Sequence, residues 1–63
     1  GNMTLTRKTY YLVLGRVKDG SLYNVWRELE TLDLNEANAK CRELNATNTQ
    51  NKYYIETWTK VRD

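Results

Sequence analysis

Apolar and β-branched residues are densest at positions 9–17 (TYYLVLGRV), a pattern that predicts a strand. Residues 18–20 (KDG) follow as a turn signal, because Asp and Gly accept the backbone angles that tight turns need. Positions 23–29 (YNVWREL) are again rich in strand-forming residues. The first half of the chain is therefore predicted to be a β-hairpin.

The length of the hairpin loop decides which side chains share a face of the sheet. A three-residue loop at 18–20, with its glycine in the left-handed conformation, would place Val13 opposite Val25. A two-residue turn at 19–20 would place Leu14 there instead and turn one strand over relative to the other. We expect the three-residue loop, because it gathers four aliphatic residues on one face: Val13, Val17, Val25 and Leu29.

A helix start is marked by Asp33, which suits the N-cap position, with Glu36 three residues later as in a capping box. Apolar residues then recur at helical spacing on one stripe, as expected for a helix that packs on one side only: Leu34, Ala37, Cys41 and Leu44. The helix is expected to end near Asn45 and to be followed by a polar loop at 45–51.

Positions 52–61 (KYYIETWTKV) predict a third strand, with Ile55 and Val61 on one side of its alternation. The chain is thus predicted to be an α+β domain of order β-β-α-β. The most apolar strand should be central, which gives a three-stranded antiparallel sheet in the order 2-1-3 with one helix packed on one face. The helix-covered face is expected to hold Tyr11, Val13, Val17, Val25, Leu29 and Ile55, with Gly15 leaving room for close approach.

The chain has 63 residues, enough for one small domain, which we expect to span residues 3–63. Gly1-Asn2 before Met3 is expected to be a remnant of the expression vector. A domain of this size buries only about 60% of its unfolded surface, so its stability is marginal. Association with itself or with a partner is the expected additional source of stability.

Composition argues against several kinds of chemistry. Histidine is absent and Cys41 is the only cysteine, so we expect no metal, no disulfide and no activated thiol nucleophile. Cys41 lies on the apolar stripe and is expected to be a buried structural thiol. The three glycines are scattered and form no phosphate-binding loop. We therefore expect neither a cofactor nor an enzymatic activity.

The net charge of +2 is too small to indicate a nucleic-acid or membrane partner by itself. The sequence shows no signal peptide and no apolar run of transmembrane length, so we expect a cytoplasmic protein without a membrane partner. A single unpaired cysteine agrees with a reducing compartment.

The sheet face opposite the helix is expected to stay open, because one helix covers only one face. Every aromatic residue of this chain is Tyr or Trp, which suits a surface that is partly apolar and partly wet. On the expected register this open face also carries Leu14, and we select as candidate partner-binding residues Tyr10, Leu12, Arg16, Trp26, Tyr54, Trp58 and Lys60. Two tryptophans with Leu12 and Leu14 would form an apolar patch near or above the largest size that monomers usually expose.

Three interpretations of this aromatic face remain open. One tryptophan could instead close the edge of the core. The face could be a protein interface, since Trp, Tyr and Arg dominate interface hot spots. It could also bind nucleic acid, because bases stack on sheet aromatics that are flanked by cations. The cations available for that role are Arg7, Lys8, Arg16, Lys52, Lys60 and Arg62. The nearby Glu28, Glu30 and Glu56 argue against phosphate.

We expect a small non-enzymatic protein-binding module, an inhibitor or adaptor of the kind that phages and other mobile elements encode, with a protein partner or a second copy of itself (a homodimer). The alternative is a small nucleic-acid-binding protein that uses the same aromatic and basic sheet face. Salt dependence separates the two, since phosphate contacts weaken steeply with added salt.

Overall fold

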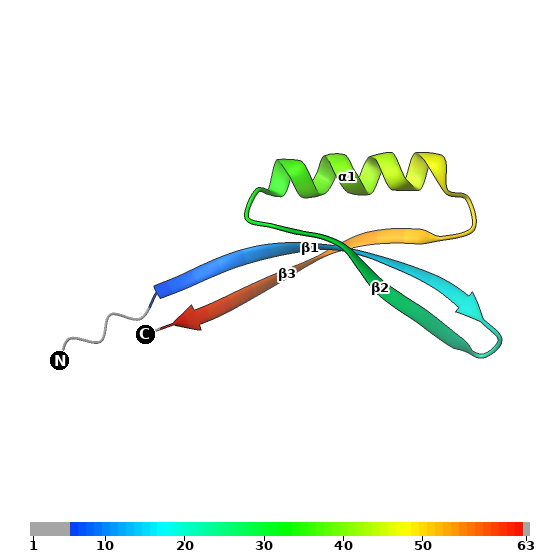
Figure 1. Ribbon diagram of the computed structural model, residues 1–63, viewed down its shortest axis with the longest axis horizontal. Helices are drawn as coiled ribbons and strands as arrows, with labels where there is room; N and C mark the ends of the chain where they lie inside the picture. The colour runs from blue at the N-terminus through cyan, green and yellow to red at the C-terminus, as the bar shows by residue number, and fades with distance from the viewer. Residues whose placement is uncertain (1–5, 63) are drawn as a thin grey trace.

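The computed structural model describes residues 6–62, with the side chains of residues 7–61. It has the predicted order of elements: β1 (Thr6–Asp19), β2 (Leu22–Thr31), α1 (Leu34–Thr47) and β3 (Lys52–Arg62). The three strands are antiparallel in the order β2-β1-β3, as predicted, and α1 lies along one side of them (Figure 1). Gly1, Asn2 and the expected domain start at Met3 lie outside the described residues.

Only the middle of the sheet has three strands. β1 pairs with β2 over Tyr11–Asp19 and with β3 over Thr6–Arg16, so the two pairings overlap only from Tyr11 to Arg16. Six strand residues span about 20 Å, close to the 14 residues of α1 at about 21 Å. The helix therefore matches the three-stranded centre in length. Two-stranded ribbons extend beyond it on both sides, and the Cα trace measures 52 × 27 × 11 Å (Figure 1).

The hairpin turn differs from both predicted forms. Asp19 lies opposite Leu22, so the loop is Gly20-Ser21. Gly20 has φ 66°, and no non-glycine residue among those described has a positive φ, which is the pattern of a type II′ turn. Gly20 thus has the positive φ that was expected, whereas the expected three-residue loop is wrong.

A β-bulge in β2 reconciles this turn with the core. Val13 lies opposite Leu29, but its neighbour Leu14 lies opposite Arg27, which leaves Glu28 as the extra residue. Val13 is six positions from Asp19 along β1, whereas Leu29 is seven positions from Leu22 along β2. The short turn and the Val13–Leu29 pair can therefore coexist only if β2 carries one unpaired residue.

The register set by the two-residue turn corrects two of the predicted face assignments. Trp26 lies opposite Gly15 and so belongs to the helix-covered face, not to the open one. Val25 lies opposite Arg16 on the open face and is 54% exposed, so it is not part of the core. The interpretation in which one tryptophan closes the core edge therefore holds for Trp26.

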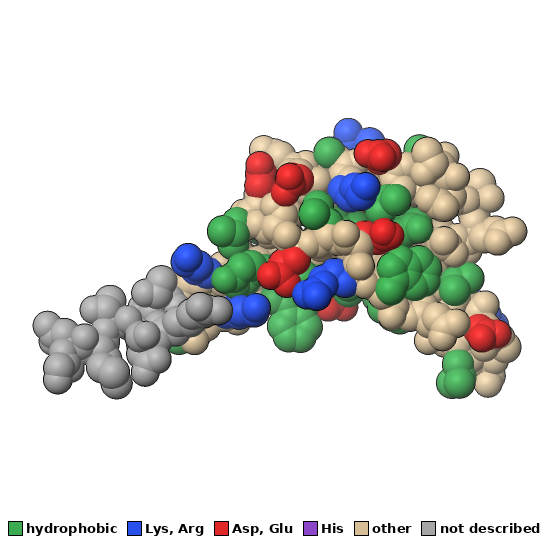
Figure 2. All heavy atoms as spheres, viewed as in Figure 1, with side chains coloured by type: hydrophobic (Ala, Val, Ile, Leu, Met, Phe, Trp, Pro, Cys, Tyr) green, Lys and Arg blue, Asp and Glu red, His purple; other side chains and the backbone are tan. Residues whose placement is uncertain are grey.

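The core is small and centres on the helix-covered face. Val13 and Ala37 are fully buried and Tyr53 is 8% exposed. The Trp26 and Tyr53 rings meet edge to face, 6.1 Å apart, across Gly15. A Cβ at Gly15 would lie 2.7 Å from atoms of both rings, so glycine is required there for the rings to approach. Hydrophobic side chains are visible between helix and strands in Figure 2.

The helix begins at the predicted cap. The Asp33 carboxylate accepts hydrogen bonds from the backbone N–H groups of Asn35 and Glu36, at 2.9 and 3.4 Å. The Asp33 N–H donates to the Thr31 hydroxyl at 3.0 Å, so Thr31 takes the part that a capping box gives to Glu36. The stripe is only partly enclosed, because Leu34 is exposed and Cys41 is half-buried rather than buried.

The end of α1 is fixed to β3 by one side chain. The helix runs to Thr47, two residues beyond the predicted end, so Asn45 is helical and not part of the polar loop. The Asn45 amide nitrogen donates to the Tyr53 carbonyl, and its oxygen accepts from the Tyr53 N–H, both at 3.0 Å. Asn45 thus pairs with the outer edge of β3 as a neighbouring strand would.

Candidate binding face

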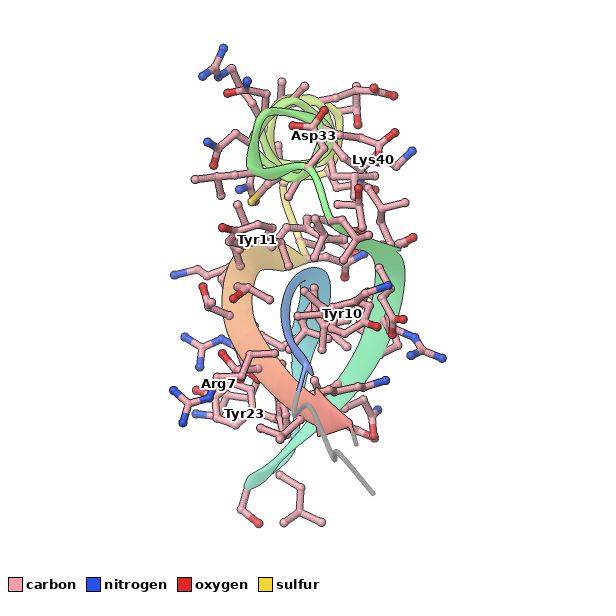
Figure 3. The ribbon with its side chains drawn as sticks, turned by 90° about the vertical axis from the view of Figure 1, so that its left-hand side faces the viewer. Arg7, Tyr10, Tyr11, Tyr23, Asp33 and Lys40 are labelled. Carbon is pink, nitrogen blue, oxygen red and sulfur yellow. The ribbon has the colours of Figure 1, made fainter. Side chains whose placement is uncertain are left out.

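We define the open face as the described strand side chains on the side of the sheet away from α1. Figure 3 shows Tyr11 between the sheet and the helix, and Tyr10 on the other side. Alternation along each strand and the cross-strand register assign the remaining members. The open face comprises Lys8, Tyr10, Leu12, Leu14, Arg16, Lys18, Tyr23, Val25, Arg27, Glu30, Lys52, Tyr54, Glu56, Trp58 and Lys60.

The open face is more basic than the whole chain. Its six cations and two carboxylates give a formal charge of +4, twice the +2 of the chain. Within the described part of the chain, the only ion pair is Arg27–Glu30, at 2.9 Å. The other acid of the face, Glu56, accepts a hydrogen bond from the Trp58 indole N–H at 2.9 Å. Five cations therefore have no described carboxylate within ion-pair distance: Lys8, Arg16, Lys18, Lys52 and Lys60.

These cations lie against aromatic rings. The Arg16 guanidinium is 5.1 Å from the centroid of the Tyr23 ring and 5.9 Å from that of Tyr54. The Lys60 ammonium is 4.7 Å from the centroid of Tyr10. Such contacts hold a cation in place while leaving its N–H groups free for a ligand. Trp58 is 53% exposed, and no cation of the described side chains lies over its ring.

Two hollows border the open face, one toward each end. The one near the hairpin also includes Val17, which has the parity of the helix-covered face, and Gln50 from the loop between α1 and β3. The hairpin-end pocket, of about 230 Å³, is lined by Arg16, Val17, Lys18, Tyr23, Gln50 and Lys52. The terminal-end pocket, of about 190 Å³, is lined by Tyr10, Leu12, Arg27, Glu30, Trp58 and Lys60. The first gathers cations that are not ion-paired in the described part of the chain, whereas the second contains the Arg27–Glu30 ion pair.

Sequence alternation located most of this face. Six of the seven candidate residues lie on it, and Trp26 is the exception, because the two-residue turn sets a register that places it opposite Gly15. The open face adds Lys18, which is a strand residue and not part of the loop, and Tyr23 and Arg27, whose side of the sheet follows from the turn. Among the cations considered for phosphate, Arg7 has the parity of the helix-covered face, and the side chain of Arg62 lies outside the described residues.

Comparison of the chain with protein-family models, curated protein sequences and solved structures gave no match. Among residues 6–62, no group of three or more Asp, Glu or Cys side chains could hold a metal ion. The single helix of the described chain is not long and apolar enough to cross a membrane.

Proposed function

We propose that this chain is a non-enzymatic binding module whose open face binds single-stranded nucleic acid. The observation that carries the proposal is the set of five basic side chains that have no acidic partner among the described residues, interleaved with aromatic rings on one sheet face. Single strands are bound by positive grooves that follow the phosphates and by aromatic rings on which bases stack. The open face offers both kinds of contact.

The order of groups along the face supports an extended ligand. Lys8 and Lys60 lie at one end, Arg16 and Lys52 lie toward the other, and each pair stands directly across two strands. Residues 8 to 18 of β1 span about 33 Å, long enough for several nucleotides. Trp58 lies between the basic ends, where its exposed ring could stack on a base.

The carboxylates near the open face repel phosphate less than free carboxylates would, because each already has a partner. Glu30 is paired with Arg27, and Glu56 is hydrogen-bonded to Trp58, so the charge of each is partly offset. Glu28 lies at the bulge, where it accepts a hydrogen bond from the Trp26 indole at 3.3 Å. The acids therefore lie near the middle of the sheet, and the ends of the face remain basic.

A protein partner, including a second copy of this chain, is the second candidate. It is favoured by exposed apolar residues, since Leu22, Val25 and Trp58 are each more than half exposed. It is weakened because Trp26 contributes to the core, so the face holds one tryptophan and not two. An inhibitor or adaptor would use the same face, and either function is proposed for the cytoplasm.

The test is the salt dependence of binding. We expect a fluorescein-labelled poly-dT oligonucleotide to bind the wild-type chain, with a log–log salt slope of about −2 to −3.5 for three to five phosphate contacts. Lys60→Gln should weaken binding, while Arg42→Gln, which removes the same charge from an exposed helix position, is the matched control. No binding at low salt, or equal losses in both variants, would contradict the proposal. Salt-independent dimerisation in sedimentation would favour the second candidate.

A further inference from the structure

The hairpin-end pocket differs in its chemistry from the rest of the open face. Its lining holds three cations and no carboxylate, and its two other polar side chains, Tyr23 and Gln50, can donate hydrogen bonds. At about 230 Å³ it is smaller than the pockets that enclose whole cofactors, about 300–1,000 Å³. A compact anion fits both the size and the donors.

Arg16 is the central group of this pocket. Its guanidinium lies over the rings of Tyr23 and Tyr54, which come from β2 and β3 on either side of it. A guanidinium held between rings loses little further freedom on binding and presents its N–H edge as a fork. That fork matches two oxygens of a phosphate group, in the bidentate geometry that makes such hydrogen bonds strong.

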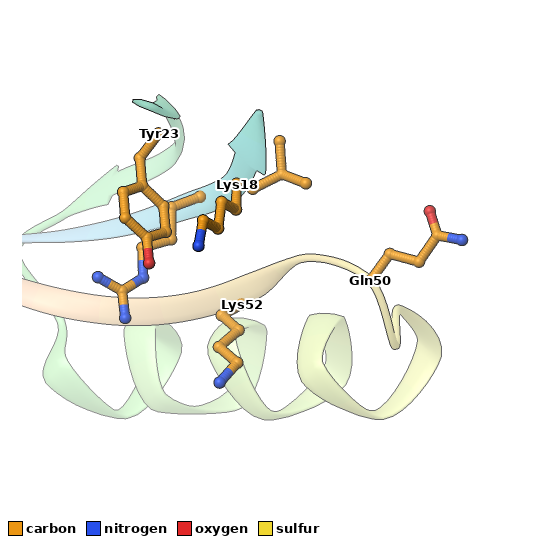
Figure 4. Close-up of a pocket in the computed structure, with 6 residues that line it drawn as sticks. Lys18, Tyr23, Gln50 and Lys52 are labelled. Carbon is orange, nitrogen blue, oxygen red and sulfur yellow. The ribbon is translucent and has the colours of Figure 1, made fainter. Parts of the chain in front are cut away.

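Two lysines from different strands line the same hollow. Lys18 extends toward Tyr23 above β3, whereas the ammonium of Lys52 extends away from Lys18 (Figure 4). Lys52 stands directly opposite Arg16 in the β1–β3 register. Like charges in that position repel one another, and a bound anion would relieve the repulsion. A lysine side chain is flexible enough to turn inward when an anion arrives.

The terminal-end pocket provides a comparison within the same face. Its Arg27 is already paired with Glu30, and a carboxylate lines the hollow. A phosphate placed there would meet that negative charge, whereas the hairpin-end pocket offers no such obstacle. The two hollows are therefore not equivalent as anion sites.

We propose that the hairpin-end pocket is a phosphate site. In it, the Arg16 guanidinium donates two parallel hydrogen bonds to one phosphate group of the bound strand, while Lys18 and Lys52 turn inward and close over that phosphate. This site rests on the proposed function, since the phosphate is taken from the single strand that lies on the open face. It deepens that function by giving the strand a fixed anchoring point next to the hairpin.

The test compares two double variants of the same face. Lys18→Gln with Lys52→Gln removes the pocket lysines, and Lys8→Gln with Lys60→Gln removes an equal charge from the other end. We expect the pocket variant to bind poly-dT about tenfold more weakly and to lower the magnitude of the salt slope by about 1, a larger loss than in the control. Thermal melts of both variants establish that they are folded.

Two further measurements separate the site from the general function. Inorganic phosphate, titrated into wild-type protein and followed by amide NMR, should shift Arg16 and Lys18 more than Lys8. Arg16→Lys keeps the charge but loses the fork, so it should weaken poly-dT binding severalfold. If wild type binds poly-dT but the pocket variant loses no more than the control, the site is wrong and the proposed function stands. If wild type binds no poly-dT, the proposed function fails, and this assignment of the site fails with it.

Discussion

The helix-covered face and the open face of the sheet consist of the same three strands, yet the side chains of the first are packed against one another and those of the second are largely exposed. On the covered face, Val13 is fully buried, and the Trp26 and Tyr53 rings meet across a glycine. On the open face the tyrosine rings contact cations, and more than half of Trp58 stays exposed. Aromatic residues occur on both faces, but only the covered ones pack against each other.

The difference shows where this chain departs from what stability alone would favour. Lys8 stands directly opposite Lys60, and Arg16 stands opposite Lys52, although like charges across two strands are destabilising. The covered face has no such conflict, and no described buried side-chain polar atom lacks a hydrogen-bond partner. Local conflicts of this kind are expected at functional sites. The contrast therefore supports the proposal that the open face is the binding face.

The largest expected change in stability comes from comparing the same substitution at two valines on opposite faces of the sheet. Val13→Asp would place a carboxylate at a fully buried position, at a cost of several kcal/mol that exceeds the stability of about 3–5 kcal/mol available to a domain this small. The matched control is Val25→Asp, an exposed position where we expect a loss of no more than about 1 kcal/mol. Circular dichroism of both variants measures this, and an unfolded Val25→Asp would mean that the faces are assigned wrongly.

A smaller effect compares two glycines. Gly15→Ala would force apart the Trp26 and Tyr53 rings, and we expect a loss of about 3 kcal/mol in the free energy of unfolding. Gly20→Ala meets no atom within 4 Å but strains a positive φ, with an expected loss of about 1–2 kcal/mol. Urea titrations give both values. The reverse order would show that the turn, and not ring packing, limits stability.

The two hydrogen bonds between Asn45 and the backbone of Tyr53 join the end of α1 to the outer edge of β3, and a substitution measures how much they stabilise the fold. Asn45→Ala removes two hydrogen bonds and leaves the N–H and C=O of Tyr53 unpaired beside a buried ring, so we expect a loss of about 2 kcal/mol. Asn38→Ala, at an exposed position of the same helix, is the control and should change stability by less than about 0.5 kcal/mol. Equal melting temperatures for the two variants would exclude this role.

The smallest effect on stability, with the largest on binding, is expected at Trp58. Trp58→Ser should lower the free energy of unfolding by less than about 1 kcal/mol, because more than half of the side chain is exposed. A lost stacking contact of about 1–3 kcal/mol should weaken binding to single strands by roughly 5- to 150-fold. A denaturant melt beside an anisotropy titration measures both. Should the variant unfold as Val13→Asp does, Trp58 would belong to the core.

The fold was predictable because its signals are local. The cap at Asp33 and the alternation of residues 52–61 each depend on a few neighbouring positions, and the structure confirms both. The open face was predictable only in part. Gly20-Ser21 is itself a recognised two-residue turn signal, which the neighbouring Asp19-Gly20 obscured. The bulge at Glu28 has no signal of its own, since it arises from a conflict between the turn and the distant Val13–Leu29 pair.

In genetic terms, the bulge makes the hairpin sensitive to where a codon is lost. Loss of Glu28 would straighten β2 and leave every remaining side chain on its present face, because the turn and the Val13–Leu29 pair would then agree. Loss of Asn24 would also remove the bulge, but it would shift Val25, Trp26 and Arg27 by one position relative to β1. Trp26 would then emerge on the open face while both of its neighbours turned inward. Homologues that differ by one residue in this strand could therefore share the topology and present different surfaces.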